Sequence, residues 1–464
     1  MAQYFLSANP TINNFGLDTN TIDRFFVDTG SASTLNIFQS GNNVVVTNGT
    51  NTATFTNQLL SQFAIYANNG NNNVVGVSTV TVTDNTNILI GTDFADTRTG
   101  TTIAGGDYIN GLGAGDTLNS NGGGDLIFGA GGGDTITLNA DPAANSSNLG
   151  RAATVFGGQG NDVINGDSSS RSMLLFGNLG DDIISIGGNG LDYNNSTIYG
   201  GQGNDQINAI GSNASHMLYG DIGNDVLIGG NGNDTLFGGN DADTLNGGAG
   251  NDLLFGNQGT DVITASAGND TVFGGQDADT INYGGAAGVQ LLLGNLGSDT
   301  ITGGNANDTI YGGQGNDYII GGTGADRIFG DLGSDVIGYT GTFDAAGIGA
   351  QSGLTTATAD QINGFVTGVD RISFSNGAAV SPASYTEFSN SQVTTVEQAV
   401  TAATASQAQV GIRNYVFVAG GSNGYLVEYN NAGTAIAAQT LVGLNSTSAF
   451  ESTDIIATAP GAIA

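Results

Sequence analysis

A nine-residue period is the feature that most restricts what this chain can fold into. From Gly220 seven nonamers follow without a break, beginning GDIGNDVLI, GGNGNDTLF and GGNDADTLN, and five more follow an interruption at 283–293. Four looser copies occupy 102–137, and three isolated copies lie between these blocks. A fixed period of this kind predicts a stacked architecture in which each repeat contacts its neighbours.

The residue types within a nonamer have separate roles. Gly recurs at positions one, two and four, where it permits a positive φ and lets carbonyl oxygens approach closely. Asp recurs at position six and supplies a carboxylate beside those carbonyls, which suits the all-oxygen environment that Ca²⁺ prefers. Position eight is apolar, and in a short strand it would point inward, as we expect for Ile164, Leu236, Ile263 and Ile310.

This pattern resembles that of the RTX (repeats-in-toxin, hemolysin-type) calcium-binding family, whose nonamer is Gly-Gly-x-Gly-x-Asp-x-apolar-x, and the resemblance covers residues 91–338. It implies an all-β fold, a right-handed parallel β-roll in which two nonamers make one coil. It also implies that Ca²⁺ lies between turns that stack on the same edge. The implied metal ligands are the position-six aspartates Asp107, Asp116, Asp125, Asp134, Asp162, Asp182, Asp205, Asp225, Asp234, Asp243, Asp252, Asp261, Asp270, Asp279, Asp299, Asp308, Asp317, Asp326 and Asp335.

If two turns make one coil, successive turns alternate between two edges. We define edge A by the turns that begin at Gly111, Gly129, Gly157, Gly177, Gly200, Gly220, Gly238, Gly256, Gly274, Gly294, Gly312 and Gly330, and edge B by the turns between them. Edge A is predicted to be continuous and edge B to be interrupted by longer, metal-free turns. Counting stacked pairs of turns then predicts roughly 15 Ca²⁺ ions. Asp241 and Asp277 replace the fourth-position Gly, and Asp tolerates the left-handed conformation better than most residues.

The charge balance favours multivalent cations as partners. The chain has 41 acidic and seven basic residues, all of them Arg, for a net charge of −34. Clustered cations that could pair with phosphates are lacking, so nucleic acid and anionic lipid are poor partners, and no apolar run is long enough for membrane insertion. Because stacked carboxylates repel one another, we expect Ca²⁺ to be structural and the calcium-free chain to be largely unfolded.

The regions that flank the repeats predict three domains. Residues 1–90 form an N-terminal β region, because Thr-, Asn- and Val-rich runs alternate with Asn-Gly turns. It could be a separate domain or a cap for the roll. Residues 91–338 form the roll, and residues 339–464 form a C-terminal, mostly-β cap and secretion region.

The C-terminal region contains several local signals. The stretch 360–374 (DQINGFVTGVDRISF) resembles the segment that follows the roll in exported family members, while 392–408 predicts a helix and 415–429 a hairpin. The tail is similar to the uncleaved region that type I secretion systems read. No N-terminal signal peptide is visible. Together these features imply that the type I secretion machinery exports the chain to the cell surface or the extracellular medium.

The residues do not favour an enzyme. Zero Cys excludes thiolate sites, and the single histidine, His216, is expected to be an exposed spacer. There is no His-Glu-x-x-His and no Gly-x-Ser-x-Gly with a usable His. Calcium explains each pair of carboxylates, so no acid pair is left for glycosidase chemistry.

Position nine on edge B is the remaining regularity. It is occupied by Phe128, Phe156, Phe176, Tyr199, Tyr219, Phe237, Phe255, Phe273, Leu293, Tyr311 and Phe329. This predicts an aromatic ladder at the strand spacing of about 4.8 Å. Such rings either stack and shield one another, lie under a terminal domain, or form a contact between subunits.

Two functional hypotheses of different classes follow. The first is an exported calcium-binding structural protein that self-assembles as a homo-oligomer into a surface layer or extracellular filament. The alternative is a calcium-dependent adhesin in which the N-terminal region binds a glycan or a cell surface. An accessory roll for a separately encoded enzyme is a weaker third.

Overall fold

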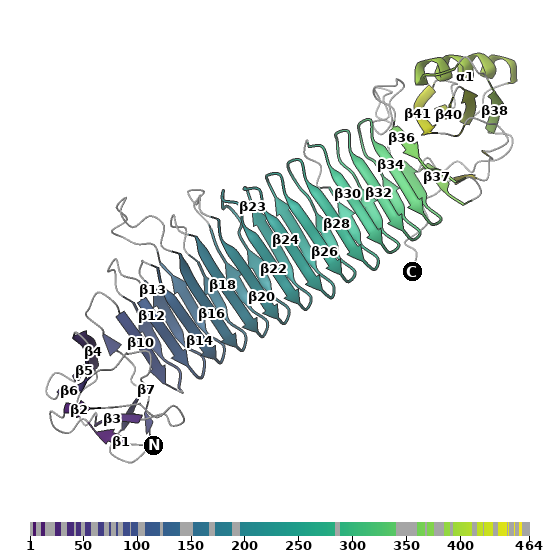
Figure 1. Cartoon of the computed structure of the whole chain (residues 1–464). Coiled ribbons are helices and arrows are strands. Elements are labelled where there is room, and N and C mark those ends of the chain that lie inside the picture. The colour runs from purple at the N-terminus through teal and green to yellow at the C-terminus, as the bar shows by residue number, and fades with distance from the viewer. Residues whose placement is uncertain are drawn as a thin grey trace. The chain divides into compact units, whose positions relative to one another are not determined.

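A computed structural model gives the architecture of the chain (Figure 1). The chain contains two compact units, Met1–Asp234 and Thr235–Ala464. The structure describes residues 3–5, 11–13, 24–28, 35–40, 43–47, 52–56, 64–68, 74–75, 80–81, 87–92, 94–100, 107–120, 124–139, 152–166, 172–187, 195–283, 288–339, 360–366, 369–374, 385–389, 393–410, 415–420, 422–429, 435–442, 444, 450 and 454–456.

The first unit begins with short strands in two small sheets. One sheet has the order β1-β3-β7-β8, and the other has the order β2-β6-β5-β4-β9. The strands are β1 (Gln3–Phe5), β2 (Thr11–Asn13), β3 (Arg24–Asp28), β4 (Leu35–Ser40), β5 (Asn43–Thr47), β6 (Thr52–Thr56), β7 (Ala64–Asn68), β8 (Val74–Val75) and β9 (Val80–Thr81). Strands β4, β5 and β6 pair in antiparallel fashion, so the expectation of strands in this region is confirmed.

The rest of the first unit is a parallel solenoid in which the chain passes alternately through two sheets. The first sheet contains β10 (Asn87–Thr92), β12 (Asp107–Leu112), β14 (Leu126–Gly131), β16 (Ala153–Gln159), β18 (Met173–Leu179), β20 (Thr197–Gln202) and β22 (Met217–Ile222). The second contains β11 (Thr97–Thr99), β13 (Thr117–Ser120), β15 (Thr135–Leu138), β17 (Val163–Asn165), β19 (Ile183–Ser185), β21 (Gln206–Asn208) and β23 (Val226–Gly230).

The second unit contains the same two-sheet coil. One sheet contains β24 (Thr235–Asn240), β26 (Leu253–Gln258), β28 (Thr271–Gln276), β30 (Leu291–Leu296), β32 (Thr309–Gln314), β34 (Arg327–Leu332) and β36 (Asp360–Asn363). The other contains β25 (Thr244–Gly248), β27 (Val262–Thr264), β29 (Thr280–Asn282), β31 (Thr300–Thr302), β33 (Tyr318–Ile320), β35 (Val336–Tyr339) and β37 (Arg371–Phe374). Strands β36 and β37, beyond the last nonamer, thus continue both sheets.

The interior of each coil consists of the position-eight side chains. Ile164, Leu236, Ile263 and Ile310 are all 0% exposed. Register pairs such as Leu236 with Leu254, in successive coils, place identical positions above one another. Because strand side chains alternate between faces, a single apolar position per strand is enough to fill this narrow core. The predicted parallel β-roll with two nonamers per coil is therefore confirmed.

The C-terminal part of the second unit contains the remaining elements. They are β38 (Tyr385–Ser389), α1 (Val396–Val410), β39 (Tyr415–Gly420), β40 (Asn423–Tyr429), β41 (Ala435–Val442) and β42 (Ile455–Ile456). Strands β39 and β40 form the predicted hairpin. Val396, Ala399 and Ala403 of the predicted helix share a core with Val416 and Val427. No helix among the described residues is long and apolar enough to span a membrane.

The glycines of the nonamer meet two different requirements. In turns such as GGQGND at 157–162, positions two and four have a positive φ, of +123° at Gly158 and +107° at Gly160. Asp241 and Asp277 adopt the same conformation at position four, with φ of +76° and +71°, as predicted. Position one differs from our expectation, because Gly256 has no positive φ. A Cβ there would collide with the Asp261 carboxylate and the Gly274 carbonyl oxygen, so the close approach is what requires Gly.

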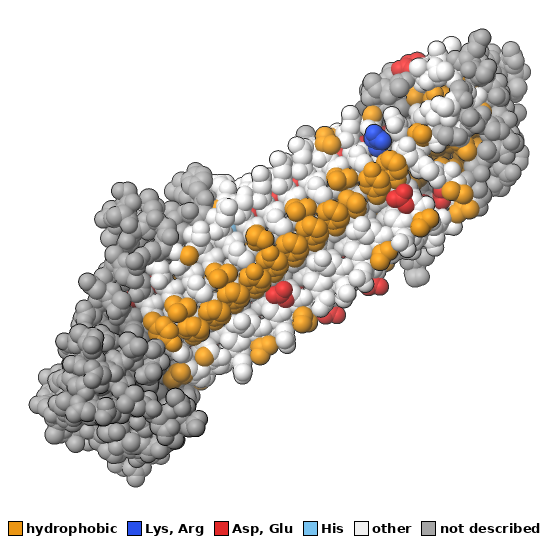
Figure 2. Space-filling view, viewed as in Figure 1, with side chains coloured by type: hydrophobic (Ala, Val, Ile, Leu, Met, Phe, Trp, Pro, Cys, Tyr) orange, Lys and Arg blue, Asp and Glu red, His pale blue; other side chains and the backbone are white. Residues whose placement is uncertain are grey.

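The position-nine rings form stacks in both units. In the first unit Phe156 and Phe176 are parallel with centroids 4.8 Å apart, and in the second unit Phe237 and Phe255 have the same 4.8 Å separation. Figure 2 shows apolar side chains gathered in a row over the strands of the roll. The rings are half-buried, because each ring covers the faces of its neighbours and leaves its edge exposed.

The two roles of glycine predict different responses to substitution at neighbouring positions. Gly256→Ala forces a Cβ against Asp261 and Gly274, so we expect it to lower the free energy of unfolding in calcium by about 1–3 kcal/mol. Asn257→Gly, where φ is already +80°, is the matched control and should change it by less than about 1 kcal/mol. Denaturant unfolding of both variants measures this, and equal losses would contradict the close-approach explanation.

Candidate metal centres

A ladder of buried aspartates runs along edge A. The backbone N–H of each position-six Asp donates a hydrogen bond to Oδ1 of the corresponding Asp in the next turn on that edge, as between Asp162 and Asp182 at 2.7 Å. In the first unit the ladder contains Asp96, Asp116, Asp134, Asp162, Asp182, Asp205 and Asp225. In the second it contains Asp243, Asp261, Asp279, Asp299, Asp317, Asp335 and Asp370.

The ladder confirms the predicted stacking of edge A turns within each unit. It includes the 28-residue step from Asp134 to Asp162 and the 35-residue step from Asp335 to Asp370. The extra residues are therefore accommodated between the edge A turns. The ladder also includes Asp96, in a degenerate repeat, and Asp370, in the segment that follows the last nonamer.

The second carboxylate oxygen of these residues has a different environment. The Oδ2 atoms that are buried and have no hydrogen-bond partner are those of Asp116, Asp134, Asp162, Asp182, Asp205, Asp261, Asp270, Asp279, Asp299, Asp317, Asp326 and Asp335. A buried carboxylate oxygen without a donor is strongly unfavourable unless a cation lies against it. The same orphaned atom thus recurs along both units.

Other oxygens converge on the same places. Asp261 Oδ2 and the Gly274 carbonyl oxygen face the same side of Gly256, and Asp299 Oδ2 and the Gly312 carbonyl oxygen likewise lie against Gly294. All of these atoms are acceptors, so they have nothing to donate to one another. Such a donor set fits a hard divalent cation such as Ca²⁺.

The composition of these groups excludes softer metals at the described sites. No three His, Cys, Asp or Glu side chains meet around one point in the part of the chain that the structure describes. Each turn places one position-six carboxylate inward, and backbone carbonyl oxygens lie beside it. Zinc, which prefers nitrogen and sulfur ligands, therefore does not fit these groups, whereas Ca²⁺ does.

Burial makes the ladder carboxylates poor acids in the absence of a cation. Desolvation raises the pKa of Asp162, Asp182 and Asp317 to about 7. The pKa of Asp279 rises to about 8, because burial is reinforced by the neighbouring charges of Asp261 and Asp299. A cation between the turns would remove both causes, since it neutralises the charge and replaces the lost hydration.

Edge B contains ladders of the same kind. The backbone N–H of Asp107 donates to Asp125 Oδ1, and that of His216 donates to Asp234 Oδ1. A longer series in the second unit contains Asp252, Asp270, Gln290, Asp308, Asp326 and Asp360. Gln290 therefore continues the ladder through the interruption of the repeat. The sequence pattern did not predict this role, because it identifies only aspartates at position six.

The expectation that His216 is an exposed spacer is wrong. The side chain is 1% exposed and occupies position six of its turn. Its Nδ1 accepts the N–H of Ser196 at 3.2 Å, as an Asp Oδ1 does elsewhere, and its Nε2 lies 2.7 Å from Ser212 Oγ. The turn directs any position-six side chain inward, and burial lowers the pKa of His216.

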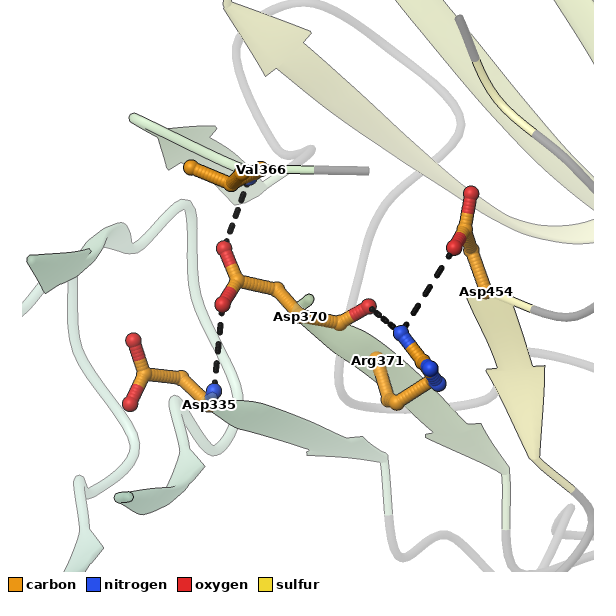
Figure 3. A network of polar contacts seen from close by, with 5 residues as sticks. All are labelled: Asp335, Val366, Asp370, Arg371 and Asp454. Carbon is orange, nitrogen blue, oxygen red and sulfur yellow. Dashed lines mark hydrogen bonds and ion pairs between the residues drawn. The ribbon is translucent and has the colours of Figure 1, made fainter. Parts of the chain in front are cut away.

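Arginines lie beside both ends of the edge A series. Arg98 occupies an inward-facing strand position, is 1% exposed and forms an ion pair with Asp96 at 3.0 Å. At the other end, Arg371 donates to the Asp370 carbonyl oxygen at 2.8 Å and lies 3.7 Å from Asp454 (Figure 3). The repeat pattern gives no sign of Arg98, which replaces the apolar residue of position eight, or of Arg371, which stands at position seven, where the consensus specifies no residue type.

These features define a parallel β-roll whose turns carry buried carboxylates and convergent carbonyls. The model of the RTX calcium-binding nonapeptide repeat, in four copies, matches residues 151–170, 219–254, 255–289, 284–319 and 302–337. These stretches are therefore RTX repeats, which bind Ca²⁺. A comparison with curated proteins finds no match.

The raised pKa values predict how the calcium-free chain responds to pH. The ordinary Asp pKa is 3.8, whereas Asp279 in the folded roll has a pKa of about 8. The folded state therefore binds more protons, and the stability that this gives is complete below about pH 4 and lost as the pH rises through about 7 to 8. We expect calcium-depleted protein to show more β-structure by circular dichroism at about pH 5.5 than at about pH 8. Identical spectra at the two pH values would contradict this.

Proposed function

We propose that this protein is an exported, calcium-binding structural protein that folds on Ca²⁺ and self-assembles into a surface layer or extracellular filament. The observation that carries the calcium part is the recurrence of a buried Asp Oδ2 without a hydrogen-bond partner beside convergent carbonyl oxygens. The ligands in this proposal are the position-six aspartates.

Charge neutralisation supports a structural role for the metal. The chain has a net charge of −34, and roughly 15 Ca²⁺ would contribute about +30. Binding energy of this kind is folding energy, because the unfolded chain has no preformed sites. The buried aspartates are then components of the roll and have no catalytic role in the proposal.

Export is supported by the same chemistry. Sites that fold only with calcium need a compartment where calcium is plentiful, and proteins with RTX repeats are typically exported. The C-terminal region, with its helix α1 and its hairpin of β39 and β40, is the part that we assign to recognition by type I secretion machinery.

Self-assembly is supported by the flank of the roll. The stacked rings of each unit present a row of apolar edges (Figure 2), and an apolar row of this length is more than a soluble monomer ordinarily exposes. A second copy of the chain repeats the same strand spacing, so its surface can match this row over many coils. We therefore assign the ring edges to the contact between copies.

The calcium part of the proposal predicts a loss of structure on chelation. At neutral pH, removal of Ca²⁺ by EGTA should abolish the β-sheet circular dichroism, because the buried carboxylates then repel one another without compensation. Restoring millimolar Ca²⁺ should recover the spectrum, and the same concentration of Mg²⁺ is the control. A native spectrum that persists in EGTA would refute calcium-dependent folding.

The assembly part predicts a separate outcome. Electron microscopy of the wild type in Ca²⁺ should show ordered sheets or fibres, and replacing Phe237, Phe255 and Phe273 together by Ser should abolish them while calcium uptake is retained. The matched control replaces Asn246, Thr264 and Asn282 by Ser, at the position-nine sites of edge A. Dispersed wild-type monomers would refute self-assembly and leave the adhesin hypothesis in its place.

A further inference from the structure

The roll contains two kinds of aspartate turn. In what we call an open turn, positions two and four have positive φ, as at Gly322 (+101°) and Gly324 (+147°), and the Oδ2 of the position-six Asp, here Asp326, has no hydrogen-bond partner. In a closed turn, positions two and four do not have positive φ, and the same Oδ2 accepts a backbone N–H from position two.

Two of the predicted metal ligands lie in closed turns on edge B. Asp308 accepts Gln290 N–H on Oδ1 and Gly304 N–H on Oδ2, both at 2.8 Å. Asp234 accepts His216 N–H on Oδ1 and Gly230 N–H on Oδ2, both at 2.7 Å. Both oxygens of each carboxylate thus have a protein donor, which is the condition that the open turns do not meet.

The residues that precede these closed turns on edge B are not aspartates. Gln290 is 1% exposed, and its Oε1 accepts Asp270 N–H at 3.0 Å, which is the usual ladder bond. Its Nε2 donates to the Gly268 carbonyl oxygen at 2.7 Å. In the edge A turn of Asp299, Oδ1 likewise accepts the ladder bond, from Asp279 N–H at 2.8 Å, but the second atom is an acceptor, Oδ2, that has no hydrogen-bond partner. The Gln290 amide therefore places a hydrogen-bond donor where an open turn has a carboxylate oxygen that needs a cation.

His216 makes the corresponding arrangement in the first unit. Its Nδ1 accepts Ser196 N–H, which requires the proton to be on Nε2, and Nε2–H then donates to Ser212 Oγ. The ring thus uses both nitrogens within the protein. A neutral imidazole hydrogen-bonded in this way offers no lone pair to a metal ion.

We propose that edge B contains two calcium-independent clasps, one formed by His216 with the closed turn of Asp234 and the other by Gln290 with the closed turn of Asp308. Hydrogen bonds within the protein satisfy the buried carboxylates at these two places, as Ca²⁺ does between open turns. This inference rests on the proposed calcium function and narrows it, because it removes Asp234 and Asp308 from the set of ligands. Calcium then acts mainly along edge A, while edge B is held at these two places whatever the calcium concentration.

The number of bound ions tests the proposal directly. Asp299→Asn alters an open turn, and we expect equilibrium dialysis with ⁴⁵Ca to show about one to two fewer ions per chain than in the wild type. Asp308→Asn alters the closed turn on the other edge and should leave the number unchanged, even though the loss of an acceptor lowers stability. An equal loss of ions in both variants would overturn the clasp, whereas a wild type that binds no Ca²⁺ would overturn the calcium function itself.

A second variant decides the matter if Asp308→Asn does not fold. Gln290→Glu keeps the shape of the side chain but places a carboxylate oxygen against the Gly268 carbonyl, so it makes this position dependent on a cation. The thermal midpoint should fall at limiting Ca²⁺ and recover at saturating Ca²⁺. Gln276→Glu, at an exposed position on edge A, is the matched control and should show no such dependence. A fall in Gln290→Glu that is the same at both calcium concentrations would overturn the proposal.

Discussion

The fold depends on one interaction, the hydrogen bond from the backbone N–H of a position-six residue to the side chain of the next turn on the same edge. In the open turns it engages Oδ1 of a buried Asp and leaves Oδ2 among carbonyl oxygens. One carboxylate thus sets the spacing of the turns and at the same time creates a group of oxygens that needs a cation. Stability and metal binding are for this reason properties of the same atoms.

The register fixed by these bonds determines the rest of each coil. When successive turns align, position eight falls on position eight, and a single apolar side chain such as Ile263 suffices to close the core. Position nine then falls on position nine, so rings such as those of Phe255 and Phe273 stack with their centroids 4.9 Å apart. The apolar row on the flank is therefore a consequence of the same register that stacks the carboxylates, and an assembly built on it would also depend on calcium.

The two edges use the same backbone with different degrees of dependence on metal. Position six always points inward, so whatever residue stands there must satisfy the ladder bond. Asp accepts this bond with one carboxylate oxygen and retains a second oxygen that has no donor. Gln290 and His216 also accept it, but their second polar group is a donor that hydrogen-bonds to an acceptor within the protein. A change of residue at this single position can thus turn a cation-dependent contact into one that the protein makes alone.

The sequence by itself determined the period, the division into two edges, the inward apolar position and the C-terminal helix and hairpin, because each is a local or strictly periodic pattern. It did not predict the burial of His216 and Arg98 or the ladder role of Gln290, since these residues depart from the consensus and only the stacked neighbours reveal their positions. The clearest case is the pair of turns GGQGND at 157–162 and GGNGND at 229–234. They differ only at position three, yet the first is open, with positive φ at Gly158 and Gly160, and the second is closed by the Gly230 N–H. The tertiary structure decided between them, because each turn hydrogen-bonds with a turn about twenty residues away on the same edge, and for Asp234 that neighbour carries His216 rather than a carboxylate.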